Sequence, residues 1–106
     1  LPMRISLLAG LCLVAASTLC AQPVPRPARL GLCAACHGAN GEATMPGVPN
    51  LAGQRLDYLR DALAQYRDGR RDAPVMRTAI GALSAADLDA LARWYSAQPT
   101  ARQAQP

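Results

Sequence analysis

Apolar residues recur at helical spacing in the middle of the chain. The stripe consists of four residues, three or four positions apart: Leu56, Leu59, Leu63 and Tyr66. Such spacing puts the side chains on one face of a helix, so the pattern predicts an amphipathic helix over residues 56–67. Gly69 follows this stretch, and glycine is favoured just beyond the last turn of a helix.

A second stripe predicts the last helix. It consists of Leu88, Leu91, Ala92 and Tyr95. Ser84 and Asp87 precede it as a variant of the capping box, with Asp in place of the usual Glu. We expect Gln98 and Pro99 to end this helix. No strand pattern is visible in the chain, so the fold class that we predict is all-α.

The other segments are shorter or less regular. They are a short helix over 28–36, a loop over 38–54, a polar loop over 70–75 and a helical turn over 77–83. Pro27 is well placed to open the first helix, because proline lacks an N–H that would be unpaired there. Gly31 lies within that helix, and we expect it to mark a close contact with another helix. Met76 follows the polar loop.

The N-terminus has the pattern of a secretory signal peptide. Arg4 supplies the positive charge, residues 5–16 form an apolar run too short to span a bilayer, and we expect cleavage after Ala21. Cys20 would permit a lipid anchor, but the bulky Leu19 before it disfavours one. The resulting organisation is a removed signal peptide (1–21), a flexible arm (22–27), one domain (28–99) and a disordered tail (100–106).

Composition limits what such a domain does. The chain has no Phe, one Trp and three Tyr, and a domain this small often needs a disulfide, a metal or a cofactor to complete its core. The formal charge is +4, but the basic residues are all Arg and are scattered among seven acids. A nucleic-acid-binding surface would need them clustered, with interleaved aromatic residues.

The stretch from Cys33 to His37 carries the chemistry. Its C-x-x-C-H spacing is typical of c-type haem attachment, because two thiols one helical turn apart can each bond one haem vinyl group. His37 can then ligate the iron. A dithiol redox site and half of a zinc site are the alternatives. The first usually accompanies a βαβ pattern, and the second needs further ligands, whereas His37 is the only histidine.

The chain resembles the class I cytochromes c, in particular the short soluble bacterial type and single halves of its dihaem relatives. The matching blocks begin with Cys33-Ala34-Ala35-Cys36-His37-Gly38, Pro49-Asn50-Leu51-Ala52-Gly53-Gln54 and Tyr58-Leu59. They continue with Tyr66-Arg67-Asp68-Gly69, Arg71, Met76, Leu83-Ser84 with Asp87, and Leu91-Ala92 with Tyr95. The resemblance implies three to four helices and long loops wrapped around one covalently bound haem c.

The resemblance also implies roles for single residues. Cys33 and Cys36 match the thioether positions, His37 the proximal ligand and Met76 the distal ligand. Met45 is the competing methionine, but it follows His37 by only eight residues.

Three further positions match residues around the haem. Pro49 matches a proline whose carbonyl accepts a hydrogen bond from the proximal histidine. Arg71 matches an arginine that can neutralise a haem propionate, and Tyr58 or Gln54 can serve the same group.

With His37 and Met76 on the iron, no coordination position stays open, so we expect a periplasmic one-electron carrier and no enzyme. A five-coordinate haem protein with ligand-binding or peroxidase-like activity, a thiol-redox enzyme and a small haem subunit of a larger periplasmic complex are the alternatives. A bc-type complex, a terminal oxidase or a periplasmic reductase would be the redox partner. We expect a monomer that binds no nucleic acid and has no stable membrane insertion after signal removal.

Overall fold

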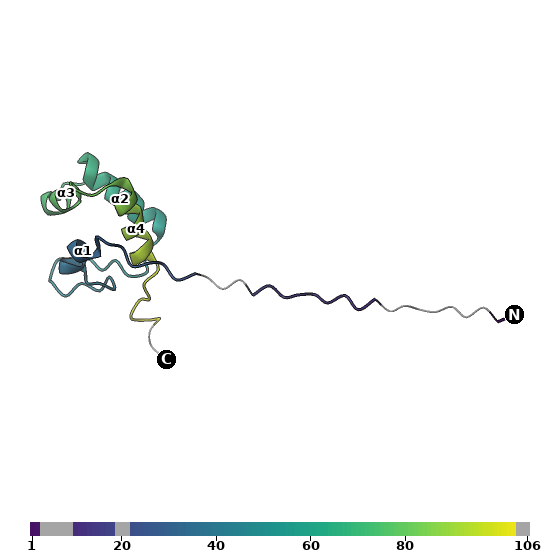
Figure 1. Cartoon of the computed structure of the whole chain (residues 1–106). Coiled ribbons are helices and arrows are strands. Elements are labelled where there is room, and N and C mark those ends of the chain that lie inside the picture. Colours follow the sequence, from purple (N-terminus) through teal and green to yellow (C-terminus); the bar gives the residue numbers. More distant parts are fainter. Residues whose placement is uncertain (3–9, 19–21, 104–106) are drawn as a thin grey trace.

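The computed structural model describes residues 1–2, 10–18 and 22–103. Within them the chain forms four helices and no strand: α1 (Leu30–His37), α2 (Leu56–Asp68), α3 (Pro74–Ile80) and α4 (Ala85–Ser96). α2 packs against both α3 and α4, and α1 lies on the other side of the domain with the loop that follows it (Figure 1). The predicted all-α fold is confirmed.

The two predicted stripes form the centre of the core. A single cluster of buried side chains joins all four helices: Leu30, Leu59, Ile80, Leu83, Leu88, Leu91, Ala92 and Tyr95. Complete burial of one such aliphatic side chain contributes about 1.5–3 kcal/mol. The ion pairs that Asp89 makes with Arg60 and Arg93 are solvent-exposed and are each worth about 0–1 kcal/mol at most. Apolar packing therefore holds α2 against α4.

The ends of these helices follow the sequence. The Ser84 hydroxyl accepts from the backbone N–H of Asp87 at 3.0 Å, and the Asp87 carboxylate accepts from the N–H of Ser84 at 3.0 Å. This completes the predicted capping box. Gly69 ends α2 in the left-handed conformation, with φ of 83°. The guanidinium of Arg67 donates to the carbonyl of Leu83, which links the end of α2 to the start of α4.

Three of the weaker predictions were wrong. α1 begins at Leu30 instead of residue 28, because residues before it form a turn in which the N–H of Leu30 bonds the carbonyl of Pro27 at 3.2 Å. The predicted loop over 70–75 ends two residues early, because Pro74 and Val75 already belong to the first turn of α3. Proline fits there because its fixed φ suits a helix start. Gly31 has open space around it, among the described residues, and marks no close contact.

The N-terminal prediction falls largely outside the described residues, including Arg4 and Ala21. Residues 10–18 form no regular element and extend away from the domain (Figure 1). Across the described part of the chain, no helix has both the length and the apolar character needed to cross a membrane. At the other end, residues 101–103 form a turn, and the N–H of Gln103 bonds the carbonyl of Thr100 at 2.9 Å.

Candidate haem-binding site

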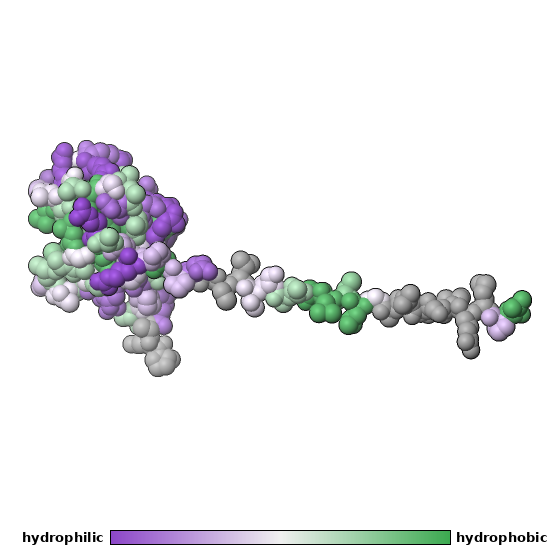
Figure 2. All heavy atoms as spheres, viewed as in Figure 1, coloured by the Kyte–Doolittle hydropathy of each residue, from purple (hydrophilic) through white to green (hydrophobic). Residues whose placement is uncertain are grey.

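A cavity of about 450 Å³ lies between the helices and the loop 38–54. All four helices contribute to its mostly apolar wall, and hydrophobic residues gather on the face of the domain between α1 and α3 (Figure 2). Its volume falls in the range of cofactor pockets, about 300–1,000 Å³. Eight residues that the sequence singled out for the haem line it: Cys33, Cys36, His37, Pro49, Gln54, Tyr58, Arg71 and Met76.

The two thiols stand three residues apart on α1. Both are free, and both are partly buried. Burial raises the pKa of the Cys33 thiol above its usual value, whereas a thiol built for disulfide exchange has a lowered pKa. Within the described residues, no three His, Cys, Asp or Glu side chains gather in a group able to hold a metal. Neither dithiol exchange nor zinc binding therefore has structural support here.

His37 is the last residue of α1 and is only 7% exposed. Its Nδ1 lies 2.9 Å from the carbonyl oxygen of Pro49. A carbonyl only accepts hydrogen bonds, so Nδ1 carries a proton, and in the neutral ring the lone pair is then on Nε2. A bond of this kind on the second ring nitrogen orients a metal-binding imidazole and raises its basicity. This hydrogen bond therefore leaves Nε2 as the ring nitrogen that can ligate haem iron.

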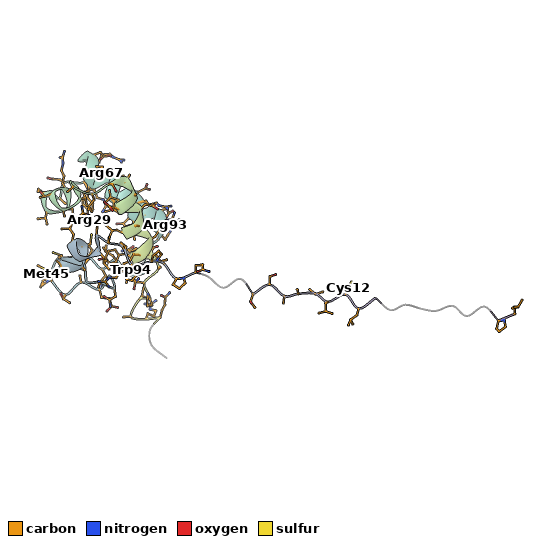
Figure 3. All side chains as sticks on the ribbon, in the orientation of Figure 1. Cys12, Arg29, Met45, Arg67, Arg93 and Trp94 are labelled. Atoms are coloured by element: carbon orange, nitrogen blue, oxygen red, sulfur yellow. The ribbon has the colours of Figure 1, made fainter. Side chains whose placement is uncertain are left out.

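Two methionines differ in their placement. Met76, in the first turn of α3, packs against the buried cluster and lines the cavity. Met45 is 48% exposed and lies in the loop at the outer edge of the domain, beside α1 (Figure 3). Only the thioether of Met76, of these two, is held at the cavity wall.

Arg71 is held at the cavity by three side chains. Its Nε donates to the Gln65 amide oxygen at 2.9 Å, and its two other nitrogens reach the hydroxyls of Tyr58 and Tyr66 at 3.3 and 3.5 Å. Its guanidinium carbon lies 5.6 and 5.4 Å from the centres of these two rings. A hydroxyl that accepts from Arg71 can still donate its own proton, so the cluster offers several donors to a carboxylate.

Sequence reasoning missed part of this arrangement. Tyr66 was assigned to an apolar stripe and to a block that matches the family, with no role toward Arg71, and Gln65 was given no role. Gln54, an alternative to Tyr58, lines the cavity, but its amide donates to the carbonyl of Asn50 at 3.2 Å. The hydroxyl of Tyr66 could have indicated this contact from the sequence, because a partly buried tyrosine usually has a polar partner.

The donor set suits a c-type haem. Two thiols that can be alkylated, a neutral imidazole and a thioether share one apolar cavity with a positioned arginine. Imidazole and thioether are the axial ligands of many cytochromes c.

The family model described as "Cytochrome C oxidase, cbb3-type, subunit III" matches residues 30–94. Cytochrome c-554(548) of Halomonas halodenitrificans is 40% identical over 73 residues, which are 66% of this chain and 88% of that protein. The thiosulfate dehydrogenase electron acceptor of Thiomonas intermedia is 44% identical over 71 residues, or 66% of this chain and 33% of that protein. Cytochrome c4 of Pseudomonas aeruginosa is 37% identical over 71 residues, 67% of this chain and 35% of that protein.

The match to the family model extends from the first residue of α1 almost to the end of α4, which is more than half of the chain. The matching part of the chain spans most of the Halomonas protein but only about a third of the other two relatives. The chain therefore belongs to the cytochrome c family, as a class I bacterial cytochrome c of all-α fold that carries electrons on one covalently attached haem c.

Proposed function

We propose that this protein is a periplasmic one-electron carrier whose haem is attached through Cys33 and Cys36 and ligated by His37 and Met76. The observation that supports this most strongly is that one apolar cavity collects all four side chains, which come from two separate helices. The haem, when bound, supplies a metal centre that accepts and releases one electron.

The protein's own residues then serve three tasks. The apolar wall of the cavity excludes water and lowers the local dielectric, which limits the change in solvation on electron transfer. His37 and Met76 would both hold the haem iron, and no position on it would then remain for a substrate. This favours electron transfer over the five-coordinate alternative with its ligand-binding or peroxidase-like activity.

Pro49, Arg71 and Tyr58 support the cofactor in this proposal. The carbonyl of Pro49 accepts from Nδ1 of His37 and holds the ring in one orientation. Arg71, fixed by Tyr58 and Gln65, places a positive charge at the cavity. That charge would offset a haem propionate and reduce the cost of burying it.

The organisation of the chain follows from the same proposal. Residues 28–99 form the cytochrome domain, in agreement with the family match to residues 30–94. Residues 1–21 direct export, residues 22–27 are a flexible arm, and residues 100–106 are a tail. Export is consistent with the chemistry, because haem is attached to such sites outside the bacterial cytoplasm.

The partners that we propose are other periplasmic or membrane redox proteins. One relative is named a thiosulfate dehydrogenase electron acceptor, which supports a dehydrogenase as an electron donor. The family model is named after an oxidase subunit, which supports a terminal oxidase as an acceptor. A bc-type complex or a periplasmic reductase has the same requirement for a one-electron carrier.

A second candidate function is a small haem subunit of a larger redox complex. The oxidase-subunit description of the family model favours it. Size-exclusion chromatography of the native periplasmic and membrane extracts, followed by the haem absorption, separates the two. A free monomeric carrier elutes at the size of the domain, and a subunit elutes with its complex.

Absorption spectra of the periplasmic protein, oxidised and reduced, test the proposal directly. We expect low-spin c-type spectra, with haem that stays on the polypeptide after acid–organic extraction. Replacing both Cys33 and Cys36 by Ala abolishes this retention. Thr78→Ala is the matched control, because Thr78 is exposed on α3 and does not line the cavity. Covalent haem in the double variant would contradict the attachment sites.

A further inference from the structure

Tyr95 on α4 is in contact with both backbone segments that carry the His37–Pro49 hydrogen bond. Its hydroxyl donates to the carbonyl of Gly38, the residue after His37, at 2.9 Å. The backbone carbonyl of Tyr95 accepts from the N–H of Gly53, four residues after Pro49, at 3.1 Å. One residue of the C-terminal helix therefore holds both ends of the loop 38–54.

We propose that Tyr95 is a positioning residue which fixes the geometry of the His37–Pro49 hydrogen bond and thereby sets the reduction potential of the haem. The inference rests on the proposed ligation by His37. It assigns to the Tyr95 hydroxyl a role beyond its place in the buried stripe.

The loop closes tightly beneath the Tyr95 ring. The carbonyl of Gly41 accepts from the N–H groups of Leu51 and Ala52 at 2.7 and 3.1 Å. Gly41 has φ of 81°, and a Cβ there would lie 2.5 Å from the nitrogen of Ala52 and 3.0 Å from Cδ1 of Tyr95. Because the first and last parts of the loop meet at this point, a shift of Gly38 is transmitted to the segment that holds Pro49.

Trp94 adds a second hydrogen bond to the same loop. Its Nε1 donates to the carbonyl of Ala39 at 2.7 Å, and Figure 3 shows Trp94 beside the loop. The two neighbouring aromatic residues of α4 thus hold two consecutive carbonyls after His37. Trp94 is only partly buried, and its acceptor lies one residue further from His37, so its influence on the ring is smaller.

The Tyr95 hydroxyl can donate its hydrogen bond to Gly38 at every physiological pH. The residue is 3% exposed, and burial raises the pKa of Tyr95 to about 12. The hydroxyl therefore keeps its proton throughout the physiological range, and the bond to Gly38 persists there. A phenol that is buried in this way needs an acceptor, and the backbone carbonyl of Gly38 is that acceptor.

Tyr95→Phe tests the inference, since it removes the hydroxyl and keeps the ring. Without the bond to Gly38, His37 is held less firmly against the carbonyl of Pro49. The imidazole then donates less electron density to the iron, so the ferric state is less stabilised. We expect the potential of the holoprotein to shift upward. We also expect the Nδ1 proton of His37 to exchange faster with solvent in proton NMR spectra.

Ser96→Ala is the matched control, because Ser96 is on the same helix and its hydroxyl donates only to the carbonyl of Arg93. It should leave both measurements unchanged. Trp94→Phe serves as the second variant if Tyr95→Phe folds poorly, and it should shift the potential in the same direction by less.

If Tyr95→Phe lowers the stability but leaves the potential and the Nδ1 exchange as in the wild type, Tyr95 is merely structural and the inference is wrong. The same holds if Trp94→Phe, used in its place, leaves both unchanged. The ferric near-infrared band that reports sulfur ligation is recorded in each sample. Wild-type protein without that band would contradict the proposed ligation instead, so the two failures are distinguishable.

Discussion

Two regions of the domain differ in what holds them together. One is the helix pair of α2 and α4. The other is the ligand side, residues 30–54 and 74–80, which joins the buried cluster through Leu30 and Ile80 but depends on further contacts. The pair buries regular apolar stripes and needs few specific polar contacts. The ligand side depends on glycines with positive φ, on backbone hydrogen bonds and on two side-chain donors from α4. Packing tolerates small adjustments, whereas a hydrogen-bonded loop requires particular residues. We therefore expect variants of the pair to change stability and variants of the ligand side to change the cofactor.

The strongest test of this difference is Met76→Ala. It removes the thioether at the cavity, so the sulfur–iron band should disappear, the potential should fall, and a site for carbon monoxide should open. The potential falls because a neutral thioether favours the ferrous state. The domain should remain folded, because the thioethers and His37 retain the haem. Redox titration and near-infrared spectra measure these effects.

Met45→Ala is the control for that variant, since Met45 is half exposed and lies outside the cavity. It should change none of the three properties. A spectrum that survives Met76→Ala and is lost in Met45→Ala would reverse the ligand assignment.

Leu91→Ala probes the helix pair. Leu91 is 3% exposed at the centre of the buried cluster, and such truncations typically cost about 2–5 kcal/mol. We expect the free energy of unfolding, measured by urea titration of the holoprotein, to fall by that amount while the near-infrared band persists. Thr78→Ala, at an exposed position of α3, should change stability little. Loss of the band in a folded Leu91→Ala protein would show that the two regions are coupled.

Gly41→Ala probes the ligand side. Its Cβ would approach the nitrogen of Ala52 to 2.5 Å at φ of 81°, and such strain costs about 1–3 kcal/mol. We expect lower stability together with a changed potential. Gly31→Ala is the matched control, because that site is open and helical. Alanine there should stabilise by about 0.5–1 kcal/mol, and the opposite ranking of the two variants would refute the assignment of strain.

Ser84→Ala should have the smallest effect. Loss of an N-cap hydroxyl costs about 1 kcal/mol, so the urea midpoint should fall slightly and the potential should stay constant. The same cap predicts a pH dependence. The backbone N–H of Ser84 holds the pKa of Asp87 below its usual value.

Because the pKa of Asp87 is lower in the folded state, its contribution is complete above about pH 4 and is lost as the pH falls through the folded value. Asp87→Asn should remove this part of the acid sensitivity in urea titrations at pH 3 and pH 7. An unchanged difference between the two pH values would mean that other carboxylates dominate.

Several features could be predicted from the sequence because they depend on neighbouring residues. α2, α4, the capping box at Ser84 and the glycine at the end of α2 all follow from local spacing. The Cys33–His37 motif is equally local, since its chemistry needs two thiols and an imidazole within one or two turns. These features were found without knowledge of any distant contact.

Tertiary structure decided the remainder. α3 is too short to show a clear stripe, so Met76 was expected after a loop instead of within a helix. The contacts of Arg71 with Tyr66 and Gln65, and of Tyr95 with Gly38, were not predicted, because Tyr66 and Tyr95 were already explained by apolar stripes. The last pair is separated by 57 positions. Hydrophobic periodicity determines which face of a helix is buried, but only the packed chain determines which backbone carbonyl meets the polar end of a buried tyrosine.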